Sequence, residues 1–216
     1  MSKKFEGKIA VVTGGSTGIG LATAKRFVDE GIDHIFITGR RKDALDTAVA
    51  DIGENVTAVE GDVANLSDLD RLYDAVKNDH RPLDIAPLGA VSDFHFDANV
   101  KGLFFSVRKG LPLMKNGGSI ILGGSIADIK GFPAMSVYSA TKAAIRPFAR
   151  TWTNELRDRR IRVDVLSPGH IDTPIMESLQ QGEALTRMKK EMANNVPLGR
   201  MGDSAEIARR GLRCCG

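Results

Sequence analysis

Short apolar runs alternate with longer segments of helical periodicity along most of the chain, and this alternation restricts the possible fold more than any other feature. Runs typical of buried strands are KIAVV (8–12), HIFIT (34–38), NVTAVEGD (55–62), SIILGG (119–124) and IRVDVLSPG (161–169). Strands that alternate with helices require right-handed crossovers and a parallel sheet covered on both faces. The sequence therefore predicts one α/β domain over residues 1–216, built on a Rossmann-like, doubly wound parallel sheet.

The helical segments between these runs have recognisable apolar faces. In the segment after the third run, Leu69, Leu72, Tyr73 and Val76 form one stripe, and Ser67 is a candidate N-cap. Two longer helices are predicted, over residues 96–115 and 137–158. The second contains Pro147, which removes the bond to the carbonyl of Ala143 and is expected to kink or strain that helix.

Charge and cysteine content narrow the class of protein. The 30 basic and 27 acidic residues give a net charge of +3 without a long basic run, which argues against a nucleic-acid surface. Cys214 and Cys215 are adjacent, so they form neither a disulfide framework nor a metal-ligand spacing, and no metal is expected. The first fifteen residues contain no apolar stretch long enough for a signal peptide or a membrane span. A cytoplasmic enzyme or binding protein fits these limits.

The glycine-rich stretch TGGSTGIG (13–20) lies between the first strand and the first helix. A dinucleotide pyrophosphate binds at this position in such folds, on the helix N-terminus. Gly14 can supply a tight turn, Gly18 a close approach of backbone to phosphate, and Gly20 close packing of helix on strand. The alternative interpretation is a flexible Gly/Ser turn.

The residues after the second strand normally determine which ribose is recognised. A carboxylate there would bind a 2′-hydroxyl, but this chain has Arg40 and Arg41, whose guanidinium groups can pair with a 2′-phosphate. This favours NADP, with NAD possible; the alternative is a solvated pair that opens the next helix. Asp62, after the third strand, is a candidate for the adenine edge, or else part of an ordinary strand-end turn.

Tyr138 and Lys142 stand one helical turn apart, so their side chains can meet on one face. A nearby ammonium favours the phenolate, which would lower the tyrosine pKa toward the range useful for proton transfer. A Tyr-xxx-Lys pair alone is also a common surface pattern, so the context decides between the two interpretations.

The context is a set of motifs in a fixed order: TGGSTGIG, GDV, NVKG, ILGGS, YSATK and LSPGHIDTP. In order and spacing the chain resembles the short-chain dehydrogenase/reductase family over most of residues 5–207. The resemblance implies hydride transfer between a nicotinamide and a carbonyl or secondary alcohol. It implies that Tyr138 is the general acid/base and that Lys142 lowers the tyrosine pKa and holds the nicotinamide ribose. It also implies that Ser125 binds the reacting oxygen and that Asn99 holds a relay water.

The resemblance also implies the residues that bind the cofactor. They are Thr13, Gly14, Ser16, Gly18, Ile19, Gly20, Arg40, Arg41, Asp62, Val63, Tyr138, Lys142, Pro168, Gly169, Ile171 and Thr173.

The chain departs from the family pattern in three places, one of which is Pro147 in the helix of Tyr138 and Lys142. The fourth strand, from PLDI (82–85), lacks the usual Asn-Ala-Gly turn; Asp84 and Asn99 lie over a dozen residues too close together, and Pro87 falls where the strand should continue. At the end, the family continues with a helix and a last strand, whereas this chain has RRGLRCCG (209–216). We expect this tail to be atypical and without apolar periodicity, and the last strand of the sheet to be missing.

These features leave two functional hypotheses. The first is an NADP-preferring oxidoreductase acting on a small carbonyl or alcohol. The alternative is a catalytically impaired or inactive family member that binds nucleotide or a partner. By resemblance, pairing through the helices that carry Asn99 and Tyr138 would give a homodimer at most, with neither nucleic acid nor membrane as a partner. Residues 175–199 are predicted to form a substrate lid, or else a mobile surface segment.

Overall fold

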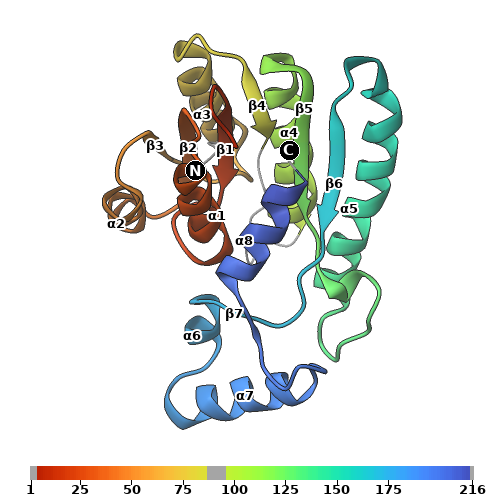
Figure 1. Cartoon of the computed structure of the whole chain (residues 1–216). Helices are drawn as coiled ribbons and strands as arrows, with labels where there is room; N and C mark the ends of the chain where they lie inside the picture. The colour runs from red at the N-terminus through yellow and green to blue at the C-terminus, as the bar shows by residue number, and fades with distance from the viewer. Residues whose placement is uncertain (1–3, 87–95, 215–216) are drawn as a thin grey trace.

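A parallel six-stranded β-sheet forms the centre of the protein (Figure 1). The computed structural model describes residues 4–86 and 96–214. In order across the sheet, the strands are β3 (Val56–Glu60), β2 (His34–Gly39), β1 (Ile9–Thr13), β4 (Leu83–Ala86), β5 (Met114–Gly123) and β6 (Arg162–Leu166). The strand order reverses between β1 and β4, and ligands of such sheets bind at the carboxyl ends of the strands around this point. The predicted Rossmann-like, doubly wound single domain is confirmed.

Helices cover both faces of this sheet. One face carries α1 (Gly18–Asp29), α2 (Lys42–Ile52) and α8 (Ser204–Arg213); the other carries α3 (Leu66–Asn78), α4 (Leu103–Gly110) and α5 (Ser136–Glu155). Strand β1 shows why both layers are needed. Its Ile9 and Val11 pack toward α3, α4 and α5, whereas Ala10 and Val12 pack toward α1, α2 and α8, and all four are buried.

The start of α3 differs from the prediction. Ser67 is not the N-cap: the cap is Asn65, whose side-chain oxygen accepts a hydrogen bond from the backbone N–H of Ser67 at 3.0 Å. Asn and Ser are comparably good caps, so the sequence pattern alone did not separate the two positions.

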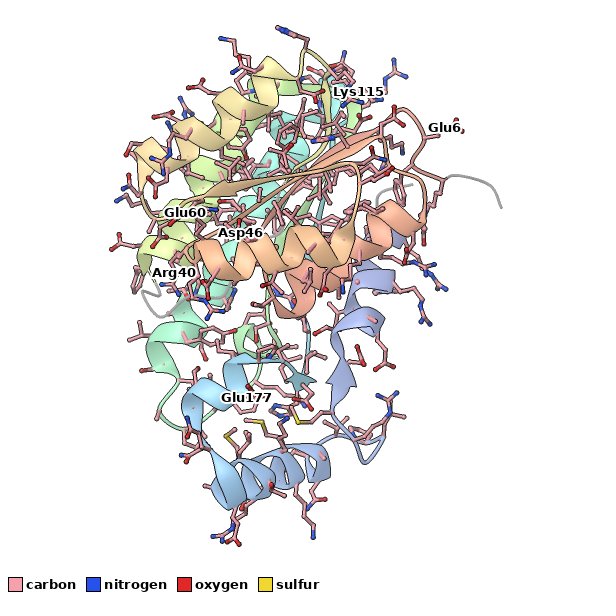
Figure 2. All side chains as sticks on the ribbon, turned by 90° about the vertical axis from the view of Figure 1, so that its left-hand side faces the viewer. Glu6, Arg40, Asp46, Glu60, Lys115 and Glu177 are labelled. Atoms are coloured by element: carbon pink, nitrogen blue, oxygen red, sulfur yellow. The ribbon has the colours of Figure 1, made fainter. Side chains whose placement is uncertain are left out.

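Strand β4 is central but only four residues long. It pairs with β1 through Ala10 and Ile85 and with β5 through Ile85 and Ser119. Its buried Asp84 accepts a hydrogen bond from the N–H of Ile9 at 3.0 Å and forms an ion pair with Lys115, which Figure 2 labels. These side-chain contacts hold the short strand on both sides. Pro87 and the position of the Asn-Ala-Gly turn that the sequence lacks lie outside the described residues.

The helix predicted over residues 96–115 has three parts. A π-helix, η1 (Asp97–Gly102), leads into α4, which is followed by the 3-10 helix η2 (Leu111–Leu113). Met114 and Lys115 already belong to β5, so the prediction runs two residues too far. π-Helical turns are rare and are frequently found at functional sites.

Strand β6 lies at one edge of the sheet, and the described residues contain no strand beyond it. The prediction that the 209–216 tail lacks apolar periodicity is wrong. Helix α8 continues to Arg213 and buries Ala208, Gly211 and Leu212, which are spaced for one helical face; in addition, Lys4 donates to the carbonyl of Leu212 at 3.2 Å.

Helix α5 continues through Pro147 without interruption. Both Pro147 and Ala143 lie on the exposed side of the helix, so water can bind the carbonyl that loses its helical partner. The hydrogen bond that Pro147 removes therefore lies on the solvent side of α5, and not on the face that carries Lys142.

Residues 175–199 contain the two helices α6 (Ile175–Leu179) and α7 (Gly182–Asn194). Figure 1 shows them beyond the carboxyl edge of the sheet, joined to it through the two-stranded pair β7 (Ile171–Asp172) and β8 (Gly202–Asp203). In the described part of the chain, no helix has both the length and the apolar character needed to cross a membrane.

Candidate active site at the carboxyl edge of the sheet

The β1–α1 turn has the backbone geometry that its glycines predict. Gly14 and Gly18 have φ values of +67° and +54°, in the left-handed region that favours glycine. A Cβ on Gly20 would lie 2.0 Å from the carbonyl oxygen of Gly14, so only glycine permits this close turn. Gly14 therefore has the tight-turn geometry that the sequence predicts. The close contact of Gly20 is with the backbone of the turn itself, and the approach of phosphate at Gly18 stays a prediction.

The N-terminus of α1 is suited to an anion. Its N-cap, Thr17, makes no side-chain capping bond, and the first turn carries no acidic residue. The N–H groups of that turn and the positive end of the helix dipole thus remain available. A Cβ at Gly18 would lie 3.6 Å from Thr173, which brings the turn close to the segment after β6. A dinucleotide pyrophosphate fits this arrangement.

Three further residues predicted to bind the cofactor, Thr13, Ser16 and Ile19, lie at the end of β1 and in the turn and helix that follow it. Thr13 and Thr38 are paired in register, and the Ser16 hydroxyl lies 2.9 Å from the position of a Cβ on Gly39. Ile19 lies in the first turn of α1 and accepts a hydrogen bond from Thr23 through its carbonyl. The β1–α1 turn and the end of β2 are thus in direct contact.

Arg40 and Arg41 are both exposed, and neither guanidinium has an ion-pair or hydrogen-bond partner within residues 4–86 and 96–214. Figure 2 shows Arg40 on the same side of the protein as Glu60, the last residue of β3. Guanidinium groups that no described residue binds can pair with an incoming phosphate at this strand end.

Asp62 lies beyond β3, where its Oδ1 accepts from the N–H of Ala64 at 2.9 Å. This is the strand-end turn that was the alternative interpretation, and it still leaves the other carboxylate oxygen for a ligand. Val63 is buried, and its carbonyl oxygen lies 2.7 Å from the position of a Cβ on Gly102. The absence of a side chain at Gly102 therefore lets η1 pack closely against the turn that follows β3.

Ser125, Tyr138 and Lys142 meet on the opposite side of the same edge. Ser125 is the N-cap of the 3-10 helix η3 (Ile126–Asp128) and accepts from the N–H of Ala127 at 3.2 Å. Its hydroxyl forms a hydrogen bond with Tyr138, near the start of α5. The ammonium of Lys142 lies 5.7 Å from the centroid of the Tyr138 ring. The three side chains therefore form one polar cluster.

The electrostatics of this cluster correct one expectation. We predicted that Lys142 lowers the pKa of Tyr138, but burial raises the pKa of the phenol, and the hydrogen bond to Ser125 offsets only part of this effect. Lys142 is itself 1% exposed, and burial lowers its pKa to about 8. Its ammonium donates to the carbonyl oxygen of Gly123 at 2.9 Å, so it is directed at β5 as well as at the tyrosine.

Asn99 lies in η1 and is 1% exposed. Its Nδ2 donates to the hydroxyl of Thr141 at 3.2 Å, whereas its Oδ1 is buried without a hydrogen-bond partner among the described residues. An unsatisfied buried oxygen is costly unless a water or ligand completes it. This geometry is compatible with the predicted relay water, which remains a prediction.

The segment after β6 also contacts the cluster. The carbonyl of Pro168 accepts from the N–H of Ile126 at 3.0 Å, which ties this segment to the turn after Ser125. A Cβ on Gly169 would meet only Ile126, at 3.9 Å, and Ile171 lies in β7. Pro168, Gly169 and Thr173 thus lie along the path between the catalytic cluster and the β1–α1 turn.

Two functional contacts were missed by the sequence reasoning. Thr141, fully buried, connects Asn99 to the carbonyl of Tyr138, to which its hydroxyl donates at 2.7 Å. The carbonyl of Gly123 holds the Lys142 ammonium. The i to i+3 spacing of Tyr138 and Thr141 is a signal that could have identified the first contact; a backbone carbonyl leaves no sequence signal.

The described residues contain no group of three or more His, Cys, Asp or Glu side chains placed to hold a metal ion. The side chains and groups at this edge are a phenol, an ammonium, a hydroxyl and an amide, beside the glycine-rich β1–α1 turn.

Comparison with known proteins identifies the class to which this site belongs. The family model described as short chain dehydrogenase matches residues 8–184. The chain belongs to the short-chain dehydrogenase/reductase family, and it is an NAD(P)-dependent oxidoreductase; nothing in the comparisons supports the inactive alternative.

Individual relatives agree with this assignment. The oxidoreductase asL5 of Sarocladium schorii is 47% identical over 222 residues, which cover 95% of this chain and 87% of the relative. The NADP-dependent (R)-specific alcohol dehydrogenase of Lentilactobacillus kefiri is 32% identical, over 96% of this chain and 89% of the relative. L-Sorbose reductase from Gluconobacter frateurii, solved with NADPH and L-sorbose, superposes with a TM-score of 0.90 at 28% identity, over 100% of this chain and 92% of that one.

Proposed function

We propose that this chain is an NADP-preferring reductase of small carbonyl compounds, in which Tyr138 supplies the proton. The observation that carries the proposal is the hydrogen bond between Ser125 and Tyr138, with the ammonium of Lys142 beside the same ring. This cluster lies at the same sheet edge as the uncapped N-terminus of α1.

The nicotinamide, when bound, supplies or accepts the hydride. The protein's own part is to place the substrate oxygen between the hydroxyls of Ser125 and Tyr138. Because burial raises the pKa of Tyr138, the phenol is protonated at neutral pH and can donate to the oxygen as charge develops there. Ser125 donates a second hydrogen bond to that oxygen, and Lys142 then stabilises the phenolate that remains. Asn99, whose Oδ1 has no hydrogen-bond partner among the described residues, holds the water that returns a proton.

The preference for NADP rests on the exposed guanidinium groups of Arg40 and Arg41 at the end of β2, which no residue within 4–86 and 96–214 binds. A bidentate pair with the 2′-phosphate would distinguish it from a 2′-hydroxyl. The NADP dependence of the Lentilactobacillus kefiri enzyme and the NADPH in the Gluconobacter frateurii structure support the same choice.

We also infer a lid and a dimer. Ile175 and Leu179 of α6 are apolar side chains that are 39% and 60% exposed, which a substrate would cover on closure of residues 175–199. On the α4–α5 face, the half-buried Phe104 and Phe148 lie 5.8 Å apart, and Phe148 stacks on the buried Trp152 at 5.2 Å. Half-exposed rings of this kind suit pairing with a second copy of the chain. We propose a cytoplasmic location for the dimer and no nucleic acid as a partner.

The experiment follows consumption of NADPH with a panel of ketones and aldehydes, for the wild type and for Tyr138→Phe. Turnover that disappears in Tyr138→Phe, from protein that still binds NADPH, supports the proposal. Equal turnover in both proteins contradicts it, because the phenol would then have no part in the reaction.

A further inference from the structure

A second polar pair lies next to the catalytic cluster. Arg146 of α5 and Asp128, the last residue of η3, form an ion pair between the guanidinium Nε and Oδ2 of the carboxylate. Arg146 follows Tyr138 by eight residues and Lys142 by four, so the three side chains occupy one stripe of α5. The pair therefore joins the helix of Tyr138 to the short helix that begins at Ser125.

The carboxylate of Asp128 is not a surface group. Its side chain is 0% exposed, whereas that of Arg146 is 38% exposed, and Oδ1 of Asp128 has no hydrogen-bond partner among the described residues. A buried carboxylate depends strongly on its charged partner, and removal of one partner from such a pair is far more harmful than loss of an exposed pair. The hydrogen bond to Asp128 in turn raises the pKa of the Arg146 guanidinium.

The backbone between Ser125 and Asp128 is short and hydrogen-bonded. The N–H of Asp128 donates to the carbonyl of Ser125 at 3.2 Å, and the Ser125 hydroxyl accepts from Ala127. A displacement of Asp128 from Arg146 would thus be transmitted to Ser125 through a single turn.

We propose that the Asp128–Arg146 ion pair is a positioning device that holds the Ser125 hydroxyl against Tyr138. Neither member touches the reacting atoms. The consequence for turnover rests on the proposed function, but the consequence for the Ser125–Tyr138 hydrogen bond does not.

Positioning and direct electrostatics predict opposite effects for Asp128→Asn. If the ion pair positions Ser125, its loss weakens the hydrogen bond that favours the phenolate, so the titration midpoint of Tyr138 rises. If Asp128 acts only through space, removal of its negative charge leaves Arg146 uncompensated, and the midpoint falls. Lys142 faces the ring in both proteins and does not account for a difference.

The chain allows this midpoint to be measured without a substrate. It contains two tyrosines, and burial raises the pKa of Tyr73 far above its ordinary value, so Tyr138 titrates first. The ultraviolet absorbance of tyrosinate is followed against pH, with circular dichroism to confirm that the protein stays folded. For Asp128→Asn we expect a rise of about half a pH unit; an unchanged or lower midpoint overturns the proposal. Asp51→Asn, which breaks the exposed Lys25–Asp51 pair, is the matched control and leaves the midpoint unchanged.

If Asp128→Asn does not fold, Arg146→Gln is measured with and without Ser125→Ala. Positioning acts through Ser125, so Arg146→Gln raises the Tyr138 midpoint in the wild-type background and has no effect in Ser125→Ala. The same rise in both backgrounds overturns the proposal.

Kinetics provide the second measurement. We expect Asp128→Asn and Arg146→Gln to lower kcat roughly 10-fold with the Kd for NADPH unchanged, and Arg146→Lys to recover most of the loss. Unaltered kcat together with lower thermal stability would mean a merely structural pair. If the wild type reduces no carbonyl compound, the proposed function fails, and the tyrosine titration still decides the role of the ion pair.

Discussion

The two sides of the carboxyl edge are built from different parts of the polypeptide. At the β1–β2–β3 side, the site is mainly backbone: the positive φ of Gly14 and Gly18, the close approach at Gly20 and the uncapped start of α1. At the β5–β6 side, it is a network of side chains in which Ser125 and Tyr138 are half-buried and Lys142 is buried.

This difference determines how each side can fail. A backbone site is lost when a side chain fills it or distorts the turn, whereas a side-chain network loses function when one polar atom is removed and the fold remains. The two sides should therefore be separable by mutation, with nucleotide affinity and turnover responding independently.

The largest effect is expected from Tyr138→Phe, which removes the proton donor and leaves the β1–α1 turn intact. We expect kcat to fall about 1,000-fold or more, because general acid catalysis contributes on this scale. The Kd for NADPH, measured by calorimetric titration, should stay within about two-fold of the wild type. A parallel loss of NADPH binding would show that the two sides are not separable.

Gly20→Ala tests the β1–β2–β3 side of the carboxyl edge, where the site is mainly backbone. Its Cβ would lie 2.0 Å from the Gly14 carbonyl, so the turn must open, and we expect NADPH affinity to fall about 100-fold, the result of losing two charge-assisted phosphate contacts. The titration midpoint of Tyr138 should not move. Gly131→Ala is the control for binding, since a Cβ there meets nothing within 4 Å.

The Arg40→Gln/Arg41→Gln double variant should weaken NADPH binding about 10-fold and leave NADH binding unchanged, because only NADPH carries the 2′-phosphate. Titrations with both nucleotides provide the measurement. Arg157→Gln, at a remote exposed position in η4 (Arg157–Arg159), is the matched control. An equal loss for both nucleotides would place the guanidinium groups away from the 2′-position.

The smallest effect concerns pH. Burial raises the pKa of Tyr138 and lowers that of Lys142 to about 8, so below pH 8 the phenol is protonated and the ammonium charged. The rate of carbonyl reduction should therefore vary less than about two-fold between pH 6 and 7.5. Above pH 8 it should decline as Lys142 loses its proton. A rate that increases with pH across this range would contradict the assignment of the phenol as proton donor.

The contrast between the two sides also explains what the sequence could predict. Glycine spacing and apolar runs are local, and they placed β1, β2 and β3 within two residues of their observed bounds, whereas the run for β6 ended three residues too late. The start of β5 was missed because Asn116, Gly117 and Gly118 are unfavourable in strands, and pairing with β4 overrides that preference.

The parts that the sequence could not supply depend on distant contacts. The spacing of Tyr138 and Lys142 was readable, but the direction of the tyrosine pKa was not, because it depends on how deeply α5 packs. The π-helical turn at Asn99 and the contact of Asp128 with Arg146 likewise arise only when separate segments meet. The burial of Leu212 in α8 had a readable spacing, which its arginine-rich surroundings obscured.

The most direct test of the account is to measure NADPH affinity and NADPH-dependent carbonyl reduction on the same preparations of wild type and Tyr138→Phe. We expect micromolar binding of NADPH in both proteins and turnover in the wild type alone. Folded wild-type protein that binds neither NADPH nor NADH would contradict it, since the glycine turn and the catalytic side chains would then not form one working site.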